Sequence, residues 1–422
     1  MVSRVFASFL LLSAIWLFSV SGDSQGAAQG SSEKPNVVLI LGDDIGWSDF
    51  GFMGHDAIRT PSLDRLASEG ALFPSAYVPT PKCRASHATV LTGLYAHEHR
   101  ICANDLKSKT YVTRLNTLPR LLAEAGYSSF QAGKVWDGGF SNVGVTSGMT
   151  IRSGAPTWII GRKTLKPIFR FIDRNVGRPF FVYYAPWMPH VPHTPPERLL
   201  RKYRGIARDL HEAKYWAMME WFDETCGQLL DHLDKKGLRD KTLVVFAVDN
   251  GWLRSDYVWS ANSVVVNYRA KDSPYDMGVR YPMIFRWTGR IKPSVIEEPV
   301  SSLDILPTVL KFCGLRPPEK LSGISLAERI LDNTRLDRSA VFGEVYAHTD
   351  VSGPHPELLP DALWMREGDW KLIEKISPAG RSYELYDLKK DPFEKKDLAQ
   401  ANPKLLNRLK GRLETWSGTF LK

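Results

Sequence analysis

Three uninterrupted apolar runs constrain the fold of this 422-residue chain more than any other feature. They are "VVLIL" at 37–41, "FFVYYA" at 180–185 and "LVVFAV" at 243–248. Continuous apolar runs of this length are typical of strands in a parallel sheet with both faces covered. The sequence therefore predicts a central sheet that is shielded from water on both sides.

Helical segments separate these runs. "TPSLDRLASEG" at 60–70 has Thr60 as its N-cap and Pro61 at the first helical position. "TLPRLLAEAG" at 117–126 predicts a second helix, and residues 209–236 have apolar residues at helical spacing. The alternation predicts an α/β fold, with a mostly parallel central sheet sandwiched by helices.

The pattern changes after about residue 330. "SAVFGEV", "ALWMREGDWKLIEK" and "SYELYDLKKDP" predict short strands joined by polar turns, and Pro403–Leu413 predicts a helix. We expect a large α/β domain at 35–330 and a smaller C-terminal antiparallel α+β subdomain at 331–422.

The N-terminus has the pattern of an export signal. Arg4 precedes an apolar run at 5–20, so residues 1–22 are predicted to be a signal peptide and residues 23–34 a linker. The run is short for a stable membrane span, although an uncleaved anchor stays open as the alternative. We therefore expect a secreted or periplasmic protein.

The charge distribution narrows the class of partner. The formal net charge is +9, and the lysines and arginines are scattered rather than clustered. The sequence contains no nucleic-acid-binding motif, so an exported polyanionic glycan is a better expected partner than nucleic acid. The four cysteines, at 83, 102, 226 and 313, are too few for a disulfide scaffold, which leaves one or two bridges open.

Acidic and amide residues follow two of the apolar runs. Asp43 and Asp44 come after the first run, and Asp249 and Asn250 come after the third. Ligands gather beyond the carboxyl ends of strands in open α/β sheets. Such oxygen donors suit Ca²⁺ or Mg²⁺ better than Zn²⁺. Either pair alone is equally consistent with a turn after a strand, so the metal prediction depends on both occurring together.

One cysteine stands just ahead of a short helix-forming segment, "PKCRASHATVLTG" at 81–93. Cys83 would lie at a helix N-terminus, where unpaired backbone N–H groups favour an anion. A lone cysteine is also commonly an inert core residue, so position alone leaves its role open.

Together these landmarks resemble the sulfatases of the alkaline-phosphatase-like superfamily. The similarity lies in "PNVVLILGDDIGWSDFGFMG", "TPSLDRLASEGALFPSAYV", "CRASHATVLTGLYAHEH", "GYSSFQAGK", "DNG", "SSLDILPTVL" and "ELYDLKKDPFE", in this order. It extends over nearly the whole mature chain, and "GKVWDGG" and "PHVP" favour iduronate-sulfatase-like members.

The resemblance implies a modified nucleophile and a metal. In these sulfatases a formylglycine-generating or sulfatase-maturating enzyme oxidises a cysteine to formylglycine (3-oxoalanine). Its hydrated form attacks sulfur while a cation, usually Ca²⁺, holds the sulfate oxygens. Cys83 takes the formylglycine position. Asp43, Asp44, Asp249 and Asn250 take the metal positions, with the modified Cys83 in the same site and Mg²⁺ as the alternative ion.

The resemblance also assigns three further residues. Lys134 matches the lysine that contacts the sulfate. Lys271 matches a second lysine, which protonates or shields the leaving oxygen, and His190 matches a histidine on the leaving-group side. Taken alone, each lysine is more readily interpreted as a solvated surface charge, and His190 is consistent with a packing residue in a proline-rich loop, so these assignments depend on the motif context.

Two positions depart from the family pattern. His87 replaces the arginine that orients the hydrated aldehyde and helps the converting enzyme recognise its target. His87 lies on the same helix face as Cys83, so it can donate a hydrogen bond or act as a base, but it lacks a permanently charged fork. Trp136 and Asp137 stand where the family has a histidine after its lysine, and an unpaired Asp137 would repel sulfate.

These departures leave three functions open. The favoured one is hydrolysis of sulfate esters, either on sulfated carbohydrate or on a small ester, by an active sulfatase in which oxidised Cys83 works with His87. The second is a catalytically inactive protein that binds sulfated glycan. The third is a phosphate or phosphonate ester hydrolase of the same superfamily. Trp187, Trp252 and Trp259 are candidate sugar-stacking residues near the predicted site.

Overall fold

The computed structural model describes residues 34–104, 111–134, 136, 138–149, 157–252, 269–346 and 359–421. The predicted signal peptide, nearly all of the linker, Asp137 and Trp259 lie outside the described residues. Among the described helices, none is long and apolar enough to cross a membrane.

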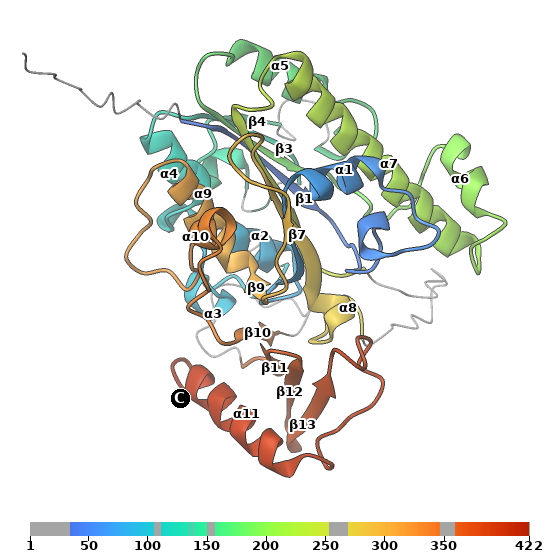
Figure 1. The fold of residues 1–422 in the computed structure, drawn as a ribbon, viewed down its shortest axis with the longest axis vertical. Coiled ribbons are helices and arrows are strands. Elements are labelled where there is room, and N and C mark those ends of the chain that lie inside the picture. Colours follow the sequence, from blue (N-terminus) through green and yellow to red (C-terminus); the bar gives the residue numbers. More distant parts are fainter. Residues whose placement is uncertain are drawn as a thin grey trace, which may run out of the picture. The chain divides into compact units, whose positions relative to one another are not determined.

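A nine-stranded sheet forms the centre of the fold (Figure 1). The three apolar runs lie in strands β1, β5 and β6, which are adjacent and parallel, with β1 in the middle. Eight strands follow the order β4-β3-β5-β1-β6-β7-β2-β8, and β9 pairs with β2. Their bounds are β1 Asn36–Gly42, β2 Ala71–Tyr77, β3 Ser128–Gly133, β4 Ser147–Gly148, β5 Phe180–Ala185, β6 Thr242–Val248, β7 Arg280–Arg286, β8 Ser294–Val295 and β9 Val300–Ser301.

Helices cover both faces of this sheet. In Figure 1, α1, α5 and α7 lie on one side of the strands, and α2, α4, α9 and α10 lie on the other. This explains why every residue from Val37 to Leu41 is at most 1% exposed. The helices are α1 Pro61–Glu69, α2 Cys83–Thr92, α3 Ala96–His99, α4 Leu118–Glu124, α5 Lys166–Arg174, α6 Glu197–Tyr203, α7 Leu210–Lys235, α8 Asp276–Val279, α9 Ile305–Phe312, α10 Ala327–Asp332 and α11 Pro403–Ser417.

The C-terminal region has a separate four-stranded antiparallel sheet. Its order is β10-β11-β12-β13, and its strands are β10 Val341–Val345, β11 Ala362–Glu367, β12 Trp370–Ser377 and β13 Gly380–Asp387. Helix α11 packs on this sheet through Leu409 and Leu413, which share an apolar cluster with Leu372. The predicted fold class is therefore confirmed, while the boundary near residue 330 stays a prediction.

Register decides where the polar strand ends meet. Gly42 of β1 pairs with Val248 of β6, so these two strands end level with each other. The next residues, Asp43 and Asp249, therefore leave the sheet side by side at one edge.

Candidate active site

The strand ends bring the predicted acidic residues together. Asp43 N–H donates to Met188 O at 3.1 Å, which joins the end of β1 to the loop after β5. Asp44 N–H donates to Asp249 Oδ1 at 3.0 Å, which joins it to the end of β6. Asp44 has a φ of 66°, the left-handed region that few non-glycine residues adopt. The main chain thus turns sharply at the point where the carboxylates meet.

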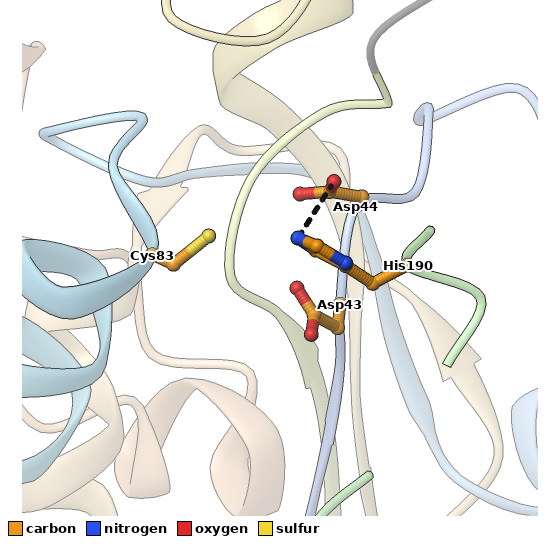
Figure 2. A group of neighbouring side chains, drawn as sticks. All are labelled: Asp43, Asp44, Cys83 and His190. Atoms are coloured by element: carbon orange, nitrogen blue, oxygen red, sulfur yellow. Dashed lines mark ion pairs between the residues drawn. The ribbon is translucent and has the colours of Figure 1, made fainter. Parts of the chain in front are cut away.

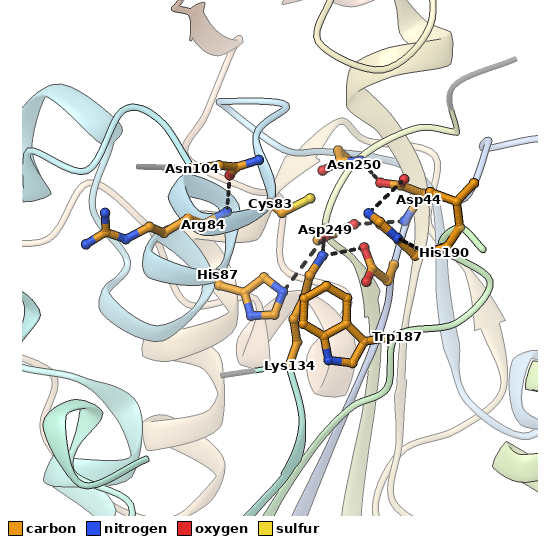
Figure 3. A network of polar contacts seen from close by, with 12 residues as sticks. Asp44, Cys83, Arg84, His87, Asn104, Lys134, Trp187, His190, Asp249 and Asn250 are labelled. Atoms are coloured by element: carbon orange, nitrogen blue, oxygen red, sulfur yellow. Dashed lines mark hydrogen bonds and ion pairs between the residues drawn. The ribbon is translucent and has the colours of Figure 1, made fainter. Parts of the chain in front are cut away.

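Two lysines and an amide pair with these carboxylates, and Figure 3 shows one of the lysines, Lys134, and the amide of Asn250 beside them. Lys134 Nζ lies 2.6 Å from Asp43 Oδ1 and 3.5 Å from Asp249 Oδ2. Lys271 Nζ lies 2.5 Å from Asp44 Oδ1, and Asn250 Nδ2 donates to the same oxygen at 2.7 Å. The structure therefore brings the predicted metal residues and both predicted lysines into one buried network.

Burial and crowding of like charge shift the pKa values of the carboxylates. Burial, together with Asp43 and Asp44, raises the pKa of Asp249 to about 7. Burial also raises the pKa of Asp43, against the opposing effect of Lys134. Burial acts in the same direction on Asp44, but Lys271 and His190 outweigh it and hold the pKa of Asp44 well below its usual value. Three carboxylates share two ammonium groups, which favours a further cation.

The donor atoms fit a divalent metal ion. Asp43, Asp44, Cys83 and His190 each offer a ligand atom, and these atoms all lie within 4.8 Å of one another (Figure 2). In the described part of the chain, Asp43 Oδ2 and Asn250 Oδ1 are buried without a hydrogen-bond partner. Buried oxygen acceptors left unpaired are unfavourable unless something binds them, so the site can hold a cation.

Cys83 begins helix α2 and faces this cluster. Its Sγ lies 3.4 Å from Lys271 Nζ, and the residue is 2% exposed. Burial raises the pKa of its thiol, against the effect of Lys134 and Lys271. The N–H of Arg84 is not available to an anion, because it donates to Asn104 Oδ1 at 3.0 Å. All four cysteines are free thiols, so no disulfide forms.

His87 lies one helical turn after Cys83, on the same face of α2. Its Nδ1 is 2.7 Å from the hydroxyl of Tyr183, and its Nε2 is 3.8 Å from Asp249 Oδ2. Burial and the charge of Lys134 lower its pKa, so the ring is neutral. Sequence reasoning missed Tyr183, because within an apolar strand nothing distinguishes its hydroxyl.

His190 reaches the site from the loop after β5. Its Nε2 lies 3.7 Å from Asp44 Oδ2, and its Nδ1 lies 2.6 Å from the carbonyl of Val191. Burial lowers its pKa against the opposing charge of Asp44. The guanidinium of Arg162 donates to the carbonyls of Trp187 and His190 at 2.8 and 2.9 Å. Sequence reasoning also missed Arg162, whose partners here are main-chain atoms.

Aromatic rings flank Lys134. Its Nζ lies 5.0 Å from the ring centroid of Trp187 and 5.6 Å from that of Trp136, and both tryptophans are partly exposed. Trp252 is 7% exposed and stacks on Tyr215 with 3.6 Å between ring centroids. Of the two candidate stacking tryptophans that are described, Trp187 thus has an accessible ring and Trp252 is packed.

Known proteins resemble this chain in sequence and in fold. The N-acetylgalactosamine-6-sulfatase of Canis lupus familiaris is 28% identical over 381 residues, which cover 77% of this chain and 71% of that protein. The structure of BT4656 in complex with its substrate D-glucosamine-2-N,6-O-disulfate superposes with a TM-score of 0.75 at 21% identity, covering 92% of this chain and 98% of the other. The phosphonate monoester hydrolase of Agrobacterium radiobacter superposes with a TM-score of 0.71 at 20% identity, covering 92% and 96%. At these identities the structural matches show the fold alone.

Two family models match the sequence. The model for the C-terminal region of N-sulphoglucosamine sulphohydrolase matches residues 267–417. The sulfatase model matches residues 35–315, which is more than half of the chain and includes every predicted site residue. The chain therefore belongs to the sulfatase family, a family of sulfuric ester hydrolases.

Proposed function

We propose that this protein hydrolyses sulfate esters of carbohydrates, using a formylglycine derived from Cys83 and a bound Ca²⁺ ion. The observation that carries the proposal is the position of Cys83. Its side chain projects from the start of α2 to within 3.4 Å of Lys271 Nζ and faces Asp43 and Asp44 (Figure 2). Inert core cysteines are typically surrounded by apolar side chains, whereas a cysteine inside a buried charged cluster is typical of a functional site.

Asp43, Asp44, Asp249 and Asn250 would hold the cation, with the modified residue 83 beside them. When bound, the cation withdraws charge from the sulfate oxygens during the reaction. Oxygen ligands favour Ca²⁺, and Mg²⁺ is the alternative. The unpaired Asp43 Oδ2 and Asn250 Oδ1 support this assignment.

The two lysines would bind and shield the anionic sulfate. Nearby carboxylates outweigh burial and raise the pKa values of Lys134 and Lys271, so both stay charged. Fixed cations in a buried site stabilise developing negative charge without reorganisation of solvent. Lys271, which is partly buried next to Cys83, is the candidate donor to the leaving oxygen.

His190 would contact the leaving group. A carbonyl only accepts hydrogen bonds, so the 2.6 Å contact with Val191 O places the hydrogen of neutral His190 on Nδ1. Nε2 then carries a lone pair that faces the site. Nε2 can accept a hydrogen bond from a hydroxyl group of the substrate, or it can take a proton from the substrate.

Carbohydrate sulfate is the proposed substrate class. The canine relative is named for a sugar sulfate, and BT4656 was solved with a disulfated glucosamine. The partly exposed ring of Trp187 beside Lys134 offers a face for a sugar next to a cation for its sulfate. We also propose that a maturating enzyme converts Cys83. The protein would be exported to the periplasm or the cell exterior.

Mass spectrometry of the Cys83 peptide, combined with hydrolysis assays, tests the proposal. We expect a formylglycine peptide in protein from its native host, and sulfate release from aryl sulfates and sulfated sugars that Cys83→Ala abolishes. A thiol at every copy of residue 83 would refute the formylglycine assignment. A verified aldehyde form with bound Ca²⁺ that cleaves no sulfate ester would refute the enzyme assignment, and a phosphonate ester assayed in parallel would identify the third function.

A further inference from the structure

The hydroxyl of Tyr183 lies against the imidazole of His87 inside the site. Tyr183 Oη is 2.7 Å from His87 Nδ1, and His87 Nε2 lies 3.8 Å from Asp249 Oδ2. Tyr183 is wholly buried and His87 is 4% exposed. The pair joins strand β5 to helix α2, one helical turn beyond Cys83.

We propose that Tyr183 is a positioning residue that donates its hydroxyl hydrogen to His87 Nδ1, so that His87 presents an Nε2–H donor toward Asp249. The catalytic importance of this pair rests on the proposed function. The hydrogen-bond arrangement itself does not.

The direction of the hydrogen bond follows from what each group can donate. Within the described residues, His87 Nδ1 is the one hydrogen-bond partner of Tyr183 Oη. A buried hydroxyl that only accepted would leave its own hydrogen unpaired, which is unfavourable. Burial and the charges of Asp249 and Asp43 raise the pKa of Tyr183, so its hydrogen stays in place. With Nδ1 accepting, a neutral imidazole carries its hydrogen on Nε2.

Ring contacts hold the imidazole in this orientation. The ring of Tyr183 meets it at 69° with 6.0 Å between centroids, and the ring of Trp136 meets it at 77° with 6.5 Å. Both are edge-to-face contacts that favour one ring plane. Tyr183 therefore sets the tautomer while the aromatic rings set the orientation.

This arrangement explains how a histidine can stand at a position where the family pattern has arginine. An arginine at this position always directs N–H donors into the site. A neutral histidine has one N–H group, which faces Asp249 only when the hydrogen is on Nε2. The opposite tautomer would turn the Nε2 lone pair toward the carboxylate of Asp249. An Nε2–H group at 3.8 Å from that carboxylate instead attracts it electrostatically, and outer-shell groups that orient a metal-binding carboxylate typically support metal affinity and activity.

Removal of the Tyr183 hydroxyl tests the proposal, with the next residue as a matched control. Tyr184 is also wholly buried on β5, and its hydroxyl donates to Thr225 Oγ1 at 2.7 Å, away from the site. We expect Tyr183→Phe to lower kcat by about 10- to 100-fold, the usual range for outer-shell partners, with KM changed by less than about threefold. Tyr184→Phe loses a comparable buried hydrogen bond but should keep kcat within about threefold of wild type. Formylglycine content is measured in every preparation.

Nitrogen NMR gives a readout that does not depend on turnover. The protein is labelled with ¹⁵N at its histidine rings, and the His87 signals are assigned by their loss in His87→Gln. Wild type and Tyr184→Phe should show Nε2 protonated and Nδ1 unprotonated, whereas Tyr183→Phe should show a mixture of tautomers. Unchanged His87 shifts in Tyr183→Phe would overturn the proposal, whether or not the protein hydrolyses any sulfate ester.

A double-mutant cycle separates positioning from an independent effect. In the His87→Gln background, Tyr183→Phe should lower kcat by no more than about twofold, because residues that act as a unit are not additive. A full additional loss in that background would show that Tyr183 acts without His87 and would overturn the proposal.

Discussion

At the scale of single residues, Lys134 is the buried cation on which charge balance in the site depends. It is 1% exposed and pairs with Asp43 at 2.6 Å and with Asp249 at 3.5 Å. Removing one partner of a buried ion pair typically destabilises a protein by about 3–5 kcal/mol, because it leaves uncompensated charge. We expect Lys134→Met to lower the melting temperature, and to lower sulfate-ester hydrolysis by at least about 100-fold because a fixed cation on the sulfate is lost.

Differential scanning calorimetry and an aryl sulfate assay measure both effects. Lys163→Met is the matched control, since Lys163 is exposed and lies over the ring of Trp158. It should change neither quantity appreciably. Equal melting temperatures for Lys134→Met and wild type would contradict the charge-balance argument.

Apart from the residues that the family resemblance assigns, the sequence predicts residues of this site only where polar residues interrupt an apolar pattern. Asp43, Asp44 and Asp249 directly follow buried strands, so their side chains had to meet at one sheet edge. Tyr183 lies inside such a strand. Its ring fits the apolar pattern, so the pattern gives no indication that its hydroxyl has a polar partner. Three of the acceptors of Arg162 are main-chain carbonyl groups, which any residue supplies, so no side-chain motif marks these partners.

At the scale of elements, one arginine holds the loop that carries His190. Arg162 donates to the carbonyls of Trp187, His190 and Pro192, and to Thr194 Oγ1, at 2.8 to 3.1 Å. A lysine at this position keeps the charge but lacks the planar fork that serves several acceptors at once. Because a hydrogen bond to a charged group contributes about 1.5–3 kcal/mol, we expect Arg162→Lys to lower kcat/KM by about 10-fold or more through misplacement of His190.

Steady-state kinetics on the aldehyde form measure this effect. Arg170 lies on helix α5 and is exposed, so Arg170→Lys is the control. Wild-type kcat/KM in Arg162→Lys would show that the loop keeps its conformation without the fork.

The strands that the sequence predicts differ physically from those that it misses. Strands β1, β5 and β6 are unbroken apolar runs at the centre of the parallel sheet. Strand β2 contains Pro74 and a register shift between Phe73 and Ala76, and β7 contains Pro282. Proline is atypical of strand interiors, so local pattern argues against both strands. The two strands pair antiparallel with each other and β7 also pairs antiparallel with β6, so tertiary contacts set their place in the sheet.

At the scale of the whole molecule, a buried ion cluster links the C-terminal sheet to the segment that carries Lys271. Lys371 of β12 is wholly buried and lies 2.7 Å from Asp276 and 2.9 Å from Glu394. Glu394 also accepts from the N–H of Asp276 at 2.6 Å. Asp276 begins α8, five residues after Lys271, so the small sheet supports one side of the site.

This cluster predicts a pH dependence of stability. Burial and Asp276 raise the pKa of Glu394 from 4.5 to about 7, against the effect of Lys371. A carboxyl group with a raised native pKa binds more protons when folded, so its contribution is fully present below about pH 4.5 and is lost as the pH rises through about 7. We expect the free energy of unfolding, measured by urea denaturation, to fall as the pH rises from about 4.5 to about 7. The fall should be smaller for Glu394→Gln than for the wild-type protein. Parallel curves for the two proteins would contradict this assignment.

Metal binding should tie the stability of the whole chain to the concentration of divalent cation. A ligand that binds only the folded state stabilises it by about 2.7 kcal/mol at 100 times its dissociation constant. Chelation should therefore lower the melting temperature of the wild-type protein, and added Ca²⁺ should restore it. Asp44→Asn should abolish the dependence of the melting temperature on Ca²⁺. Lys271 and His190 lower the pKa of Asp44, so its carboxylate is ionised and can bind a cation. Restoration by Zn²⁺ but not by Ca²⁺ would point instead to Cys83 and His190 as the dominant ligands, since thiolate and imidazole suit that ion.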